Sequence, residues 1–382
     1  LIHTLVPPAA ISHYIMNNLS NFHRALHIPP FYIPGVFHDR GWTLDMNIQA
    51  AGSLGILRKF DSADGSDSIM IKKYINHSES LDRKTLIRRE LNLLRTLQHE
   101  HIVRLLGTYY VDEEPGKEAI YSITVYCGVP LEKKILEGIY SMKDVISWTR
   151  QLLQAIHHLH INKVLFRNLH PRNMCIDANN KLTLTGFGKA RVVNHDPNLT
   201  KERGTEPYMS IEQLVDWNGA YDNTVDIWCI TTILCEMITG QGLFTGEKVK
   251  SSLKRQIEYC GPVDQAVLEK MTSPTDRTQL ATYSKKCERK DFIAILREKL
   301  MSGRAIVEAD ILEYEEPLRD FIENTLQFNA SLRMSAEEAL RHRFVYNTPA
   351  FTQANNVANN MQQLRALINQ QLAASSNVMQ FL

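Results

Sequence analysis

The sequence predicts an α+β fold in which a small β-rich part precedes a larger helical part. From about residue 42 to 126, short apolar segments alternate with polar residues and are separated by turn residues. Beyond Gly128, long apolar stretches recur at helical spacing. A chain of 382 residues can bury a core of this size. Strands followed by helices favour segregated β and α regions rather than alternating βαβ units.

Each expected element follows from its local pattern. Residues 42–74 are broken at Gly52, Gly55 and Asp64-Gly65, which predicts antiparallel strands joined by a hairpin. Leucines among basic residues predict an amphipathic helix over 81–98, and strands are expected at 102–110 and 119–126. The expected helices of the second part are 142–161, 225–239, 317–328 and 336–342.

The two ends of the chain differ from this central region. Residues 1–41 carry several prolines and are interpreted as a loosely ordered N-terminal extension. Residues 346–382 form a tail rich in Asn and Gln that lacks Asp and Glu. Apolar residues recur at helical spacing in this tail, which predicts that part of it is a docked helix. They are Val357, Met361, Leu364, Leu367, Ile368 and Leu372.

Composition excludes several classes of protein. A formal charge of +1 and a pI of about 7.8 give no global field that favours nucleic acid or an anionic membrane. The six cysteines form no C-x-x-C pair, which indicates reduced thiols in an intracellular protein. No apolar run has the length of a membrane span, and the first 40 residues lack the pattern of a signal peptide. We therefore expect a cytoplasmic protein, with the nucleus as a second compartment.

A glycine-containing loop followed by a lysine indicates a phosphate-binding region. Residues 50–57 read A-A-G-S-L-G-I-L and fit the pattern G-x-G-x-x-G-x-V, except that Ala50 replaces the first glycine. Glycines allow backbone N–H groups to approach phosphate, although a plain β-turn would explain this short motif alone. Lys72 follows on the next expected strand, and Glu90 lies on the expected helix. A surface salt bridge is the alternative explanation for this pair.

Two further motifs follow in order, and each lacks a carboxylate. Residues 166–173 read F-R-N-L-H-P-R-N and have the spacing H-R-D-L-x-P-x-N, with Asn168 at the aspartate position. Gly186-Phe187-Gly188, which begins thirteen residues after Asn173, has the spacing of D-F-G. Gly186 therefore stands where a metal-binding aspartate is expected.

With these motifs in this order, residues 42–345 resemble a protein kinase domain, and in detail the stress-activated branch of the mitogen-activated protein (MAP) kinases. Further resemblance comes from residues 99–103 (H-E-H-I-V), residues 224–228 (T-V-D-I-W) and the run Leu243-Phe244-x-Gly246. It implies a bilobal fold with an N-lobe over about 42–126 and a C-lobe over about 127–345.

The resemblance implies ATP as cofactor and assigns a nucleotide site. Thr124 would be the gatekeeper and Val125 to Gly128 the hinge that meets adenine, while Met70 would crowd the adenine face. The implied nucleotide-binding residues are Ala50, Gly52, Gly55, Leu57, Met70, Lys72, Thr124, Val125, Cys127 and Met174.

The two missing carboxylates argue against phosphoryl transfer. An amide such as that of Asn168 cannot accept the proton of a substrate hydroxyl at physiological pH. Mg²⁺ prefers hard oxygen ligands that include a carboxylate, and Asn173 is left as the only recognisable metal side chain. Phe166, in place of a histidine, is expected to extend an apolar stack of Leu94, Leu105 and Phe187.

The resemblance also implies regulatory and structural residues. Thr200, in Thr200-Lys201-Glu202, occupies the site of the T-x-Y phosphorylation motif. Arg89, Arg167 and Arg191 match arginines that hold the phosphothreonine, unless they pair with nearby carboxylates. Asp226 would hold the catalytic-loop backbone, and Glu212 would pair with Arg333 between helices.

These observations favour a MAP-kinase-like pseudokinase that acts in signalling as an interaction or regulatory module. Its expected partners are kinases or scaffolds of a MAP kinase pathway, with no nucleic acid and no membrane span. The first alternative is a low-activity or unconventional ATP-dependent Ser/Thr protein kinase, in which Asn173, another acidic group or a metal-free geometry suffices. The second is a nucleotide-responsive switch that binds ATP without Mg²⁺.

Overall fold

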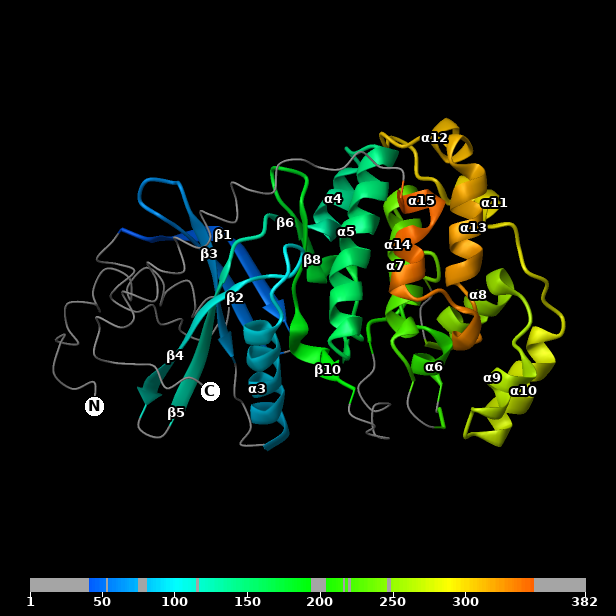
Figure 1. The fold of residues 1–382 in the computed structure, drawn as a ribbon, viewed down its shortest axis with the longest axis horizontal. Helices are drawn as coiled ribbons and strands as arrows, with labels where there is room; N and C mark the ends of the chain where they lie inside the picture. Colours follow the sequence, from blue (N-terminus) through cyan, green and yellow to red (C-terminus); the bar gives the residue numbers. More distant parts are fainter. Residues whose placement is uncertain are drawn as a thin grey trace. The chain divides into compact units, whose positions relative to one another are not determined.

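The structure is a computed structural model that describes residues 41–52, 54–74, 81–114, 117–193, 204–215, 217–218, 221–245 and 249–346. The predictions made for Thr200, for residues 1–40 and for the tail beyond Tyr346 lie outside this part of the chain. The predicted α+β class is confirmed: a β-sheet region comes first and a larger helical region follows (Figure 1). The described residues divide into two compact units, one containing 41–95 and 104–126 and the other 96–103 and 127–346.

The first unit is a five-stranded antiparallel sheet with one described helix. The strands follow the order β1-β2-β3-β5-β4 across the sheet (Figure 1). They are β1 (Thr43–Gly52), β2 (Gly55–Asp61), β3 (Ser68–Tyr74), β4 (Leu105–Glu114) and β5 (Lys117–Val125). Helix α3 (Leu81–Thr96) connects β3 to β4. Lys72 of β3 and Thr108 of β4 contact α3, which places this helix on the face of the sheet that carries those two side chains.

The second unit is built around two buried helices. Helix α5 (Met142–Ile161) begins at Ser141, whose side chain and that of Asp144 form a capping box. Helix α7 (Thr224–Thr239) is buried at every residue except Glu236, which explains why its sequence is apolar on all sides. A continuously apolar helix needs neighbours all round, so α7 forms the centre of this unit.

The described residues of the second unit also form shorter helices and two small sheets (Figure 1). The other helices are α4 (Leu131–Glu137), α6 (Ile211–Leu214), α8 (Val249–Cys260), α9 (Gln265–Glu269), α10 (Pro274–Ser284), α11 (Phe292–Lys299), α12 (Glu308–Glu313), α13 (Glu315–Thr325), α14 (Ala336–Arg341) and α15 (Arg343–Tyr346). One sheet contains β6 (Val129–Pro130), β8 (Met174–Ile176) and β9 (Leu182–Leu184), and the other contains β7 (Val164–Leu165) and β10 (Arg191–Val192). Short 3₁₀ turns occur at Pro171–Asn173, Phe187–Lys189 and Ala330–Leu332.

The expected strand at 102–110 begins later than its sequence pattern predicts. The Val103 N–H donates to the Leu184 carbonyl over 2.9 Å, and the Leu184 N–H donates to the His101 carbonyl over 2.8 Å. This pairing with β9 draws residues 101–103 away from the five-stranded sheet, so β4 starts at Leu105. A local β pattern cannot show which partner strand a residue will pair with.

Two general expectations can be compared with the described residues. All six cysteines are free thiols. Within the described ranges, no helix combines the length and the apolar character needed to cross a membrane.

Candidate functional site

Lys72 and Glu90 form a close ion pair within the first unit. The Lys72 Nζ lies 2.9 Å from Oε1 and 2.8 Å from Oε2 of Glu90. The Glu90 side chain is only 4% exposed, and the Lys72 Nζ also lies 4.5 Å from the ring centre of Tyr74. The pair links β3 to α3, and both charges lose much of their contact with water. Breaking it would leave a buried charge, so it contributes to the fold as well as to any phosphate binding.

The glycine-containing loop connects the antiparallel strands β1 and β2. Ala50 pairs with Leu57, and Gly52 pairs with Gly55. A Cβ atom at Gly55 would lie 2.1 Å from the Lys73 carbonyl oxygen. Close packing of β2 on β3 therefore requires glycine at position 55, with or without a nucleotide. The assignment of this loop to phosphate stays a prediction.

The residues predicted to meet adenine lie on β3, β5 and β8 and in the segment directly after β5. Met70 of β3 pairs with Thr124 of β5, and Val125 ends β5. Met174 begins β8 and is fully buried. Burial raises the pKa of the Cys127 thiol well above its usual range, so this thiol is a weak nucleophile.

Gly128 shows why the predicted hinge needs a glycine at its end. Its φ is +96°, and a Cβ atom would lie 2.1 Å from the Ile176 carbonyl oxygen. A larger residue would both strain the backbone and collide with β8.

Asp226 organises the backbone of the catalytic-loop segment. Its Oδ2 accepts from the Phe166 N–H over 3.0 Å, and its Oδ1 accepts from the Arg167 N–H over 2.8 Å. Asp226 is fully buried, and His160 Nε2 lies 3.0 Å from Oδ2. Arg167 has a φ of +66°, which is unfavourable for a residue with a side chain. The Asp226 carboxylate offsets this strain, because it accepts hydrogen bonds from both backbone N–H groups of the turn.

Asn168 has both ends of its amide engaged. The Thr205 hydroxyl donates to Asn168 Oδ1 over 2.8 Å, and Asn168 Nδ2 lies 3.3 Å from His170 Nε2. Burial, with help from Arg172 and Lys189, lowers the pKa of His170 to about 4. The ring is therefore neutral at pH 7, and Nε2 can accept the amide hydrogen.

The space beside Gly186 is filled by Asn173. Gly186 has a φ of +78°, and a Cβ atom built there would lie 2.4 Å from Asn173 Oδ1 and 2.5 Å from its Cγ. The Asn173 Nδ2 donates to the Asn168 carbonyl over 3.0 Å. The carboxamide thus occupies the position from which a side chain at residue 186 would extend.

These residues do not fit a Mg²⁺ ion. Of Asn173 and Gly186, only Asn173 has a side-chain oxygen, and this oxygen belongs to an amide and not to a carboxylate. Mg²⁺ bound to a nucleotide usually keeps at least one carboxylate ligand. Among the described residues, no cluster of three or more His, Cys, Asp or Glu side chains could hold a metal ion.

Phe166 and Phe187 pack edge to face in the second unit. Their ring centres are 5.2 Å apart with an interplanar angle of 90°, and both side chains are buried. This is a favourable aromatic geometry. Leu94 and Leu105 belong to the first unit, so the predicted stack of all four side chains stays a prediction.

The predicted regulatory arginines have different environments. Arg167 is fully buried, and its Nε donates to the Lys189 carbonyl over 2.8 Å. Arg89 lies on α3 and Arg191 begins β10, and both are partly exposed. Because Thr200 is outside the described residues, phosphorylation at this site stays a prediction.

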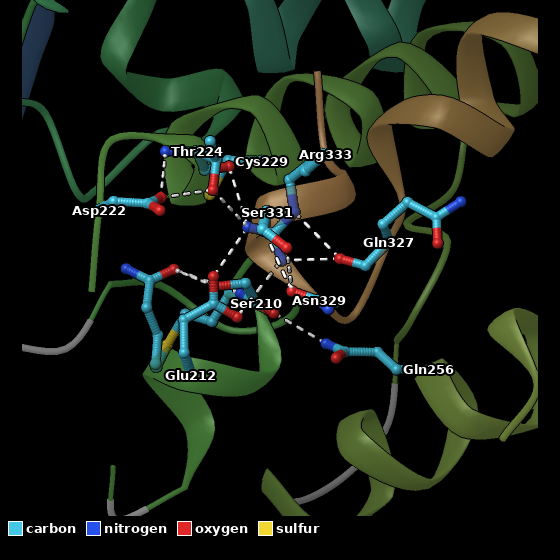
Figure 2. Close-up of polar contacts among 12 residues, drawn as sticks. Ser210, Glu212, Asp222, Thr224, Cys229, Gln256, Gln327, Asn329, Ser331 and Arg333 are labelled. Carbon is cyan, nitrogen blue, oxygen red and sulfur yellow. Dashed lines mark hydrogen bonds and ion pairs between the residues drawn. The ribbon is translucent and has the colours of Figure 1, made fainter. Parts of the chain in front are cut away.

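Glu212 and Arg333 form a buried ion pair inside the second unit (Figure 2). Arg333 Nη1 donates to Glu212 Oε1 over 2.7 Å and to the Thr224 carbonyl over 3.0 Å, while Nε donates to the Gln327 carbonyl over 3.0 Å. The guanidinium also lies 5.3 Å from the ring centre of Trp228. This network ties α6, α7 and the segment after α13 together.

Sequence reasoning did not single out Thr205 and His170. They contact Asn168, but Thr205 lies 37 positions away in sequence. The run Gly204-Thr205-Glu206-Pro207, directly after the predicted phosphorylation segment, was the available signal.

Comparisons with known proteins identify the family. The protein kinase domain family matches residues 50–345. The mitogen-activated protein kinase HOG1 of Wallemia muriae is 30% identical over 261 residues, which cover 68% of this chain and 86% of the relative. The mitogen-activated protein kinase HOG1A of Wallemia ichthyophaga is 29% identical over 303 residues (79% and 76%). The mitogen-activated protein kinase pmk-1 of Caenorhabditis elegans is 26% identical over 295 residues (77% and 73%). The chain therefore belongs to the protein kinase superfamily and, within it, to the stress-activated branch of the MAP kinases.

Proposed function

We propose that this chain is a MAP-kinase-like pseudokinase, an interaction or regulatory module of a signalling pathway with little or no phosphoryl transfer. The carrying observation is the geometry at Gly186. The position lacks a carboxylate, and the Asn173 carboxamide fills the space that a side chain there would need. A group that neutralises the developing phosphate charge is therefore missing, and each ~1.4 kcal/mol of lost transition-state stabilisation costs about tenfold in rate.

The base position supports the same proposal. The oxygen of Asn168 accepts a hydrogen bond from Thr205, and its nitrogen faces His170. The imidazole of His170 is the titratable side chain in contact with Asn168, and its pKa of about 4 makes it a weak base at neutral pH. Neither side chain can readily take a proton from a substrate hydroxyl.

A retained nucleotide site is the second candidate, and the Lys72–Glu90 ion pair favours it. The Lys72 Nζ lies 2.9 and 2.8 Å from the two carboxylate oxygens of Glu90, which supports a lysine held in one position for a phosphate. A switch that binds ATP without Mg²⁺ would need this lysine and no metal ligand. We propose kinases or scaffolds of a MAP kinase pathway as partners, because the relatives are MAP kinases.

The test is thermal unfolding of the full chain in millimolar ATP, with and without Mg²⁺, combined with a γ-phosphate transfer assay. A ligand that binds the native state must raise its melting temperature. We expect no Mg²⁺-dependent rise and no transfer. A rise without Mg²⁺ would support the switch. Phosphate transfer that disappears in Lys72→Ala would contradict the pseudokinase proposal and support a low-activity kinase.

Lys72→Ala needs a matched control, because it also leaves Glu90 buried without its partner. Each variant is therefore compared with its own ATP-free melting temperature. Lys59→Ala is the control: Lys59 pairs with Asp61 at 2.8 Å on the neighbouring strand and is not a predicted nucleotide residue. An ATP effect lost in both variants would not be assigned to Lys72.

A further inference from the structure

Two cationic side chains lie close to His170 in the second unit. Arg172 follows two positions later in the same segment, and Lys189 ends the 3₁₀ turn Phe187–Lys189. Burial lowers the pKa of His170, and the charges of Arg172 and Lys189 lower it further, while Glu132 opposes them more weakly. The charges around this imidazole are therefore positive on balance.

Hydrogen bonds connect Lys189 to His170 through a row of polar residues, which we call the polar strip. The Lys189 Nζ donates to the Gly204 carbonyl over 3.4 Å. Thr205, the next residue, donates its hydroxyl hydrogen to Asn168 Oδ1 over 2.8 Å, and Asn168 Nδ2 lies 3.3 Å from His170 Nε2. The polar strip thus brings an ammonium group, a hydroxyl, an amide and an imidazole together.

The polar strip contains no carboxylate. Asn168 and Gly186 stand at the two positions where an active kinase carries aspartates, so two negative charges are missing from this region. Aspartates repel a phosphate group and cations attract it, and the energy of both effects is inversely proportional to distance. The exchanges that remove the carboxylates therefore make the strip more favourable for an anion.

Arg172 supplies a second cation that a partner molecule can reach. Its side chain is 73% exposed, and its Nε donates over 2.7 Å to Glu132 Oε1, on a side chain that is 41% exposed. An ion pair this exposed to water is weak. A phosphate group can therefore compete with Glu132 for the guanidinium, whose planar set of donors matches phosphate oxygens.

We propose that the polar strip, together with Arg172, binds the phosphate group of a phosphorylated serine or threonine on a partner protein. Asn168 stands where a kinase positions the hydroxyl of a protein substrate, so this location favours a side chain from a second protein as the source of the phosphate. The inference deepens the proposed pseudokinase function and rests on it. The partner is recognised only after another kinase has phosphorylated it.

The test is fluorescence anisotropy of a labelled peptide pool with the full chain. Each peptide carries one fixed central phosphoserine with random neighbours, and the matched pool carries serine instead. We expect the serine pool to bind on the order of tenfold more weakly or worse, because it lacks the charged hydrogen-bond acceptors. Equal binding of the two pools would overturn the proposal.

Inorganic phosphate as a competitor separates the two sources of a phosphate group. We expect it to displace the phosphoserine pool only at concentrations on the order of a hundredfold higher than unlabelled phosphoserine peptide, because it lacks the peptide contacts. If inorganic phosphate is as effective as the peptide, the site is one for free phosphate, and the assignment to a partner protein is wrong.

Lys189→Met should weaken binding of the phosphoserine pool on the order of tenfold, because a charged donor is lost. Lys143→Met is the matched control. Lys143 is exposed at the start of α5, whereas His160 at the other end of α5 contacts Asp226, which holds the catalytic-loop segment. Equal losses in the two variants would indicate general charge attraction and would contradict a site at Lys189.

Glu132→Gln should have the opposite effect and tighten binding, because it removes the carboxylate that pairs with Arg172. Weaker binding in this variant would contradict the proposed competition. Arg172→Gln keeps the proposal testable if Lys189→Met fails to fold, because the Arg172 side chain is largely exposed. It should weaken binding on the order of tenfold, and an unchanged affinity counts against the proposal.

His170 provides a readout that loss of fold does not mimic. Arg172, Lys189 and Glu132 act on its charge, and the ring of Tyr208, whose pKa is raised by burial, lies 6.3 Å away. A bound phosphate dianion offsets the two cations, so the pKa of His170 should rise from about 4. NMR titration of the imidazole, assigned with His170→Gln, measures this. An unchanged pKa in the saturated complex would place the phosphate elsewhere.

A γ-phosphate transfer assay on the same preparation separates this inference from the proposed function. Binding without transfer supports both. No binding and no transfer would overturn the phosphate site and leave the pseudokinase proposal standing. Transfer that disappears in Lys72→Ala would contradict the pseudokinase proposal itself and, with it, the inference that rests on it.

Discussion

At Gly186 the exchange of one residue type affects both charge and space. Residue 186 has no carboxylate, and the Asn173 side chain occupies the space that a Cβ atom at residue 186 would need. The two effects differ in how they can be reversed. Restoring the charge by mutation does not restore the space, because the backbone also has a φ of +78°, where residues with a side chain are strained.

Gly186→Asp is therefore expected to lower stability without restoring a metal site. Strain and crowding together should cost about 2 kcal/mol or more in urea unfolding. ATP with Mg²⁺ should leave the melting temperature of the variant unchanged. Gly65→Asp is the matched control, because Gly65 has a φ of +70° with nothing within 4 Å, so it reports strain alone. A Mg²⁺-dependent rise in Gly186→Asp would contradict this prediction.

Glu236 on α7 is predicted to make stability depend on pH. Burial raises its pKa from 4.5 to about 6, opposed by a hydrogen bond with Tyr208 and increased by Glu132. A raised carboxyl pKa stabilises the fold below pH 4.5, and this contribution is lost as pH rises through 6. Glu236→Gln should gain up to about 2 kcal/mol relative to the parent at pH 7.5 and little at pH 4.5.

The control residue for Glu236 is expected to show the opposite pH dependence of stability. Glu338 accepts the Ser335 N–H and hydroxyl in a capping box, which lowers its pKa. Its contribution is present above the unfolded pKa of 4.5 and is lost as pH falls. Glu338→Gln should therefore lose stability at pH 7.5 but not at low pH. If urea unfolding showed the same pH trend for both variants, the assignment for Glu236 would be wrong.

At the scale of elements, two helices of the second unit end against the same arginine. Helices α4 and α7 are closed by Gly138 (φ 65°) and Gly240 (φ 85°), in the left-handed conformation common at helix ends. Arg304 Nη1 donates to the Ile135 carbonyl over 2.7 Å, and Nη2 donates to the Met237 carbonyl over 2.9 Å. One side chain thus donates to a carbonyl in the last turn of each helix.

Arg304→Ala is expected to destabilise the chain by about 2–3 kcal/mol, because it leaves carbonyls at two helix ends without a charged donor. Arg341→Ala is the comparison. Arg341 is 75% exposed and pairs with Glu337 within α14. Such an exposed pair contributes less than about 1 kcal/mol. Urea unfolding measures the free energy of unfolding of both variants. Equal losses of this free energy would show that Arg304 does not join the helix ends.

At the scale of the whole molecule, the two units each contain their own buried ion pair. Lys72–Glu90 belongs to the first unit and Glu212–Arg333 to the second, and the two pairs share no residue. Neither pair needs a substrate, so both persist in a chain without catalytic carboxylates. Structural ion pairs of this kind stabilise a kinase fold independently of its chemistry.

The losses in unfolding free energy for Lys72→Ala and Arg333→Lys should therefore add within about 0.5 kcal/mol. Glu212→Gln combined with Arg333→Lys should not add, because either change alone already breaks the same pair. Denaturant unfolding of the single and double variants measures both cycles. Strong coupling between Lys72 and Arg333 would contradict the prediction.

Local apolar patterns predicted the α+β class, and the order of the motifs predicted the family and the pairing of Lys72 with Glu90. These follow from sequence because local patterns specify strands and helices, and because a series of motifs in one order is specific to one fold. Tertiary structure decided the rest. Thr205 contacts Asn168 although 37 positions separate them in sequence, and Asn173 fills the space beside Gly186. Residues 101–103 pair with β9 and therefore do not belong to β4. Contacts between distant segments depend on three-dimensional packing, which no local pattern in the chain encodes.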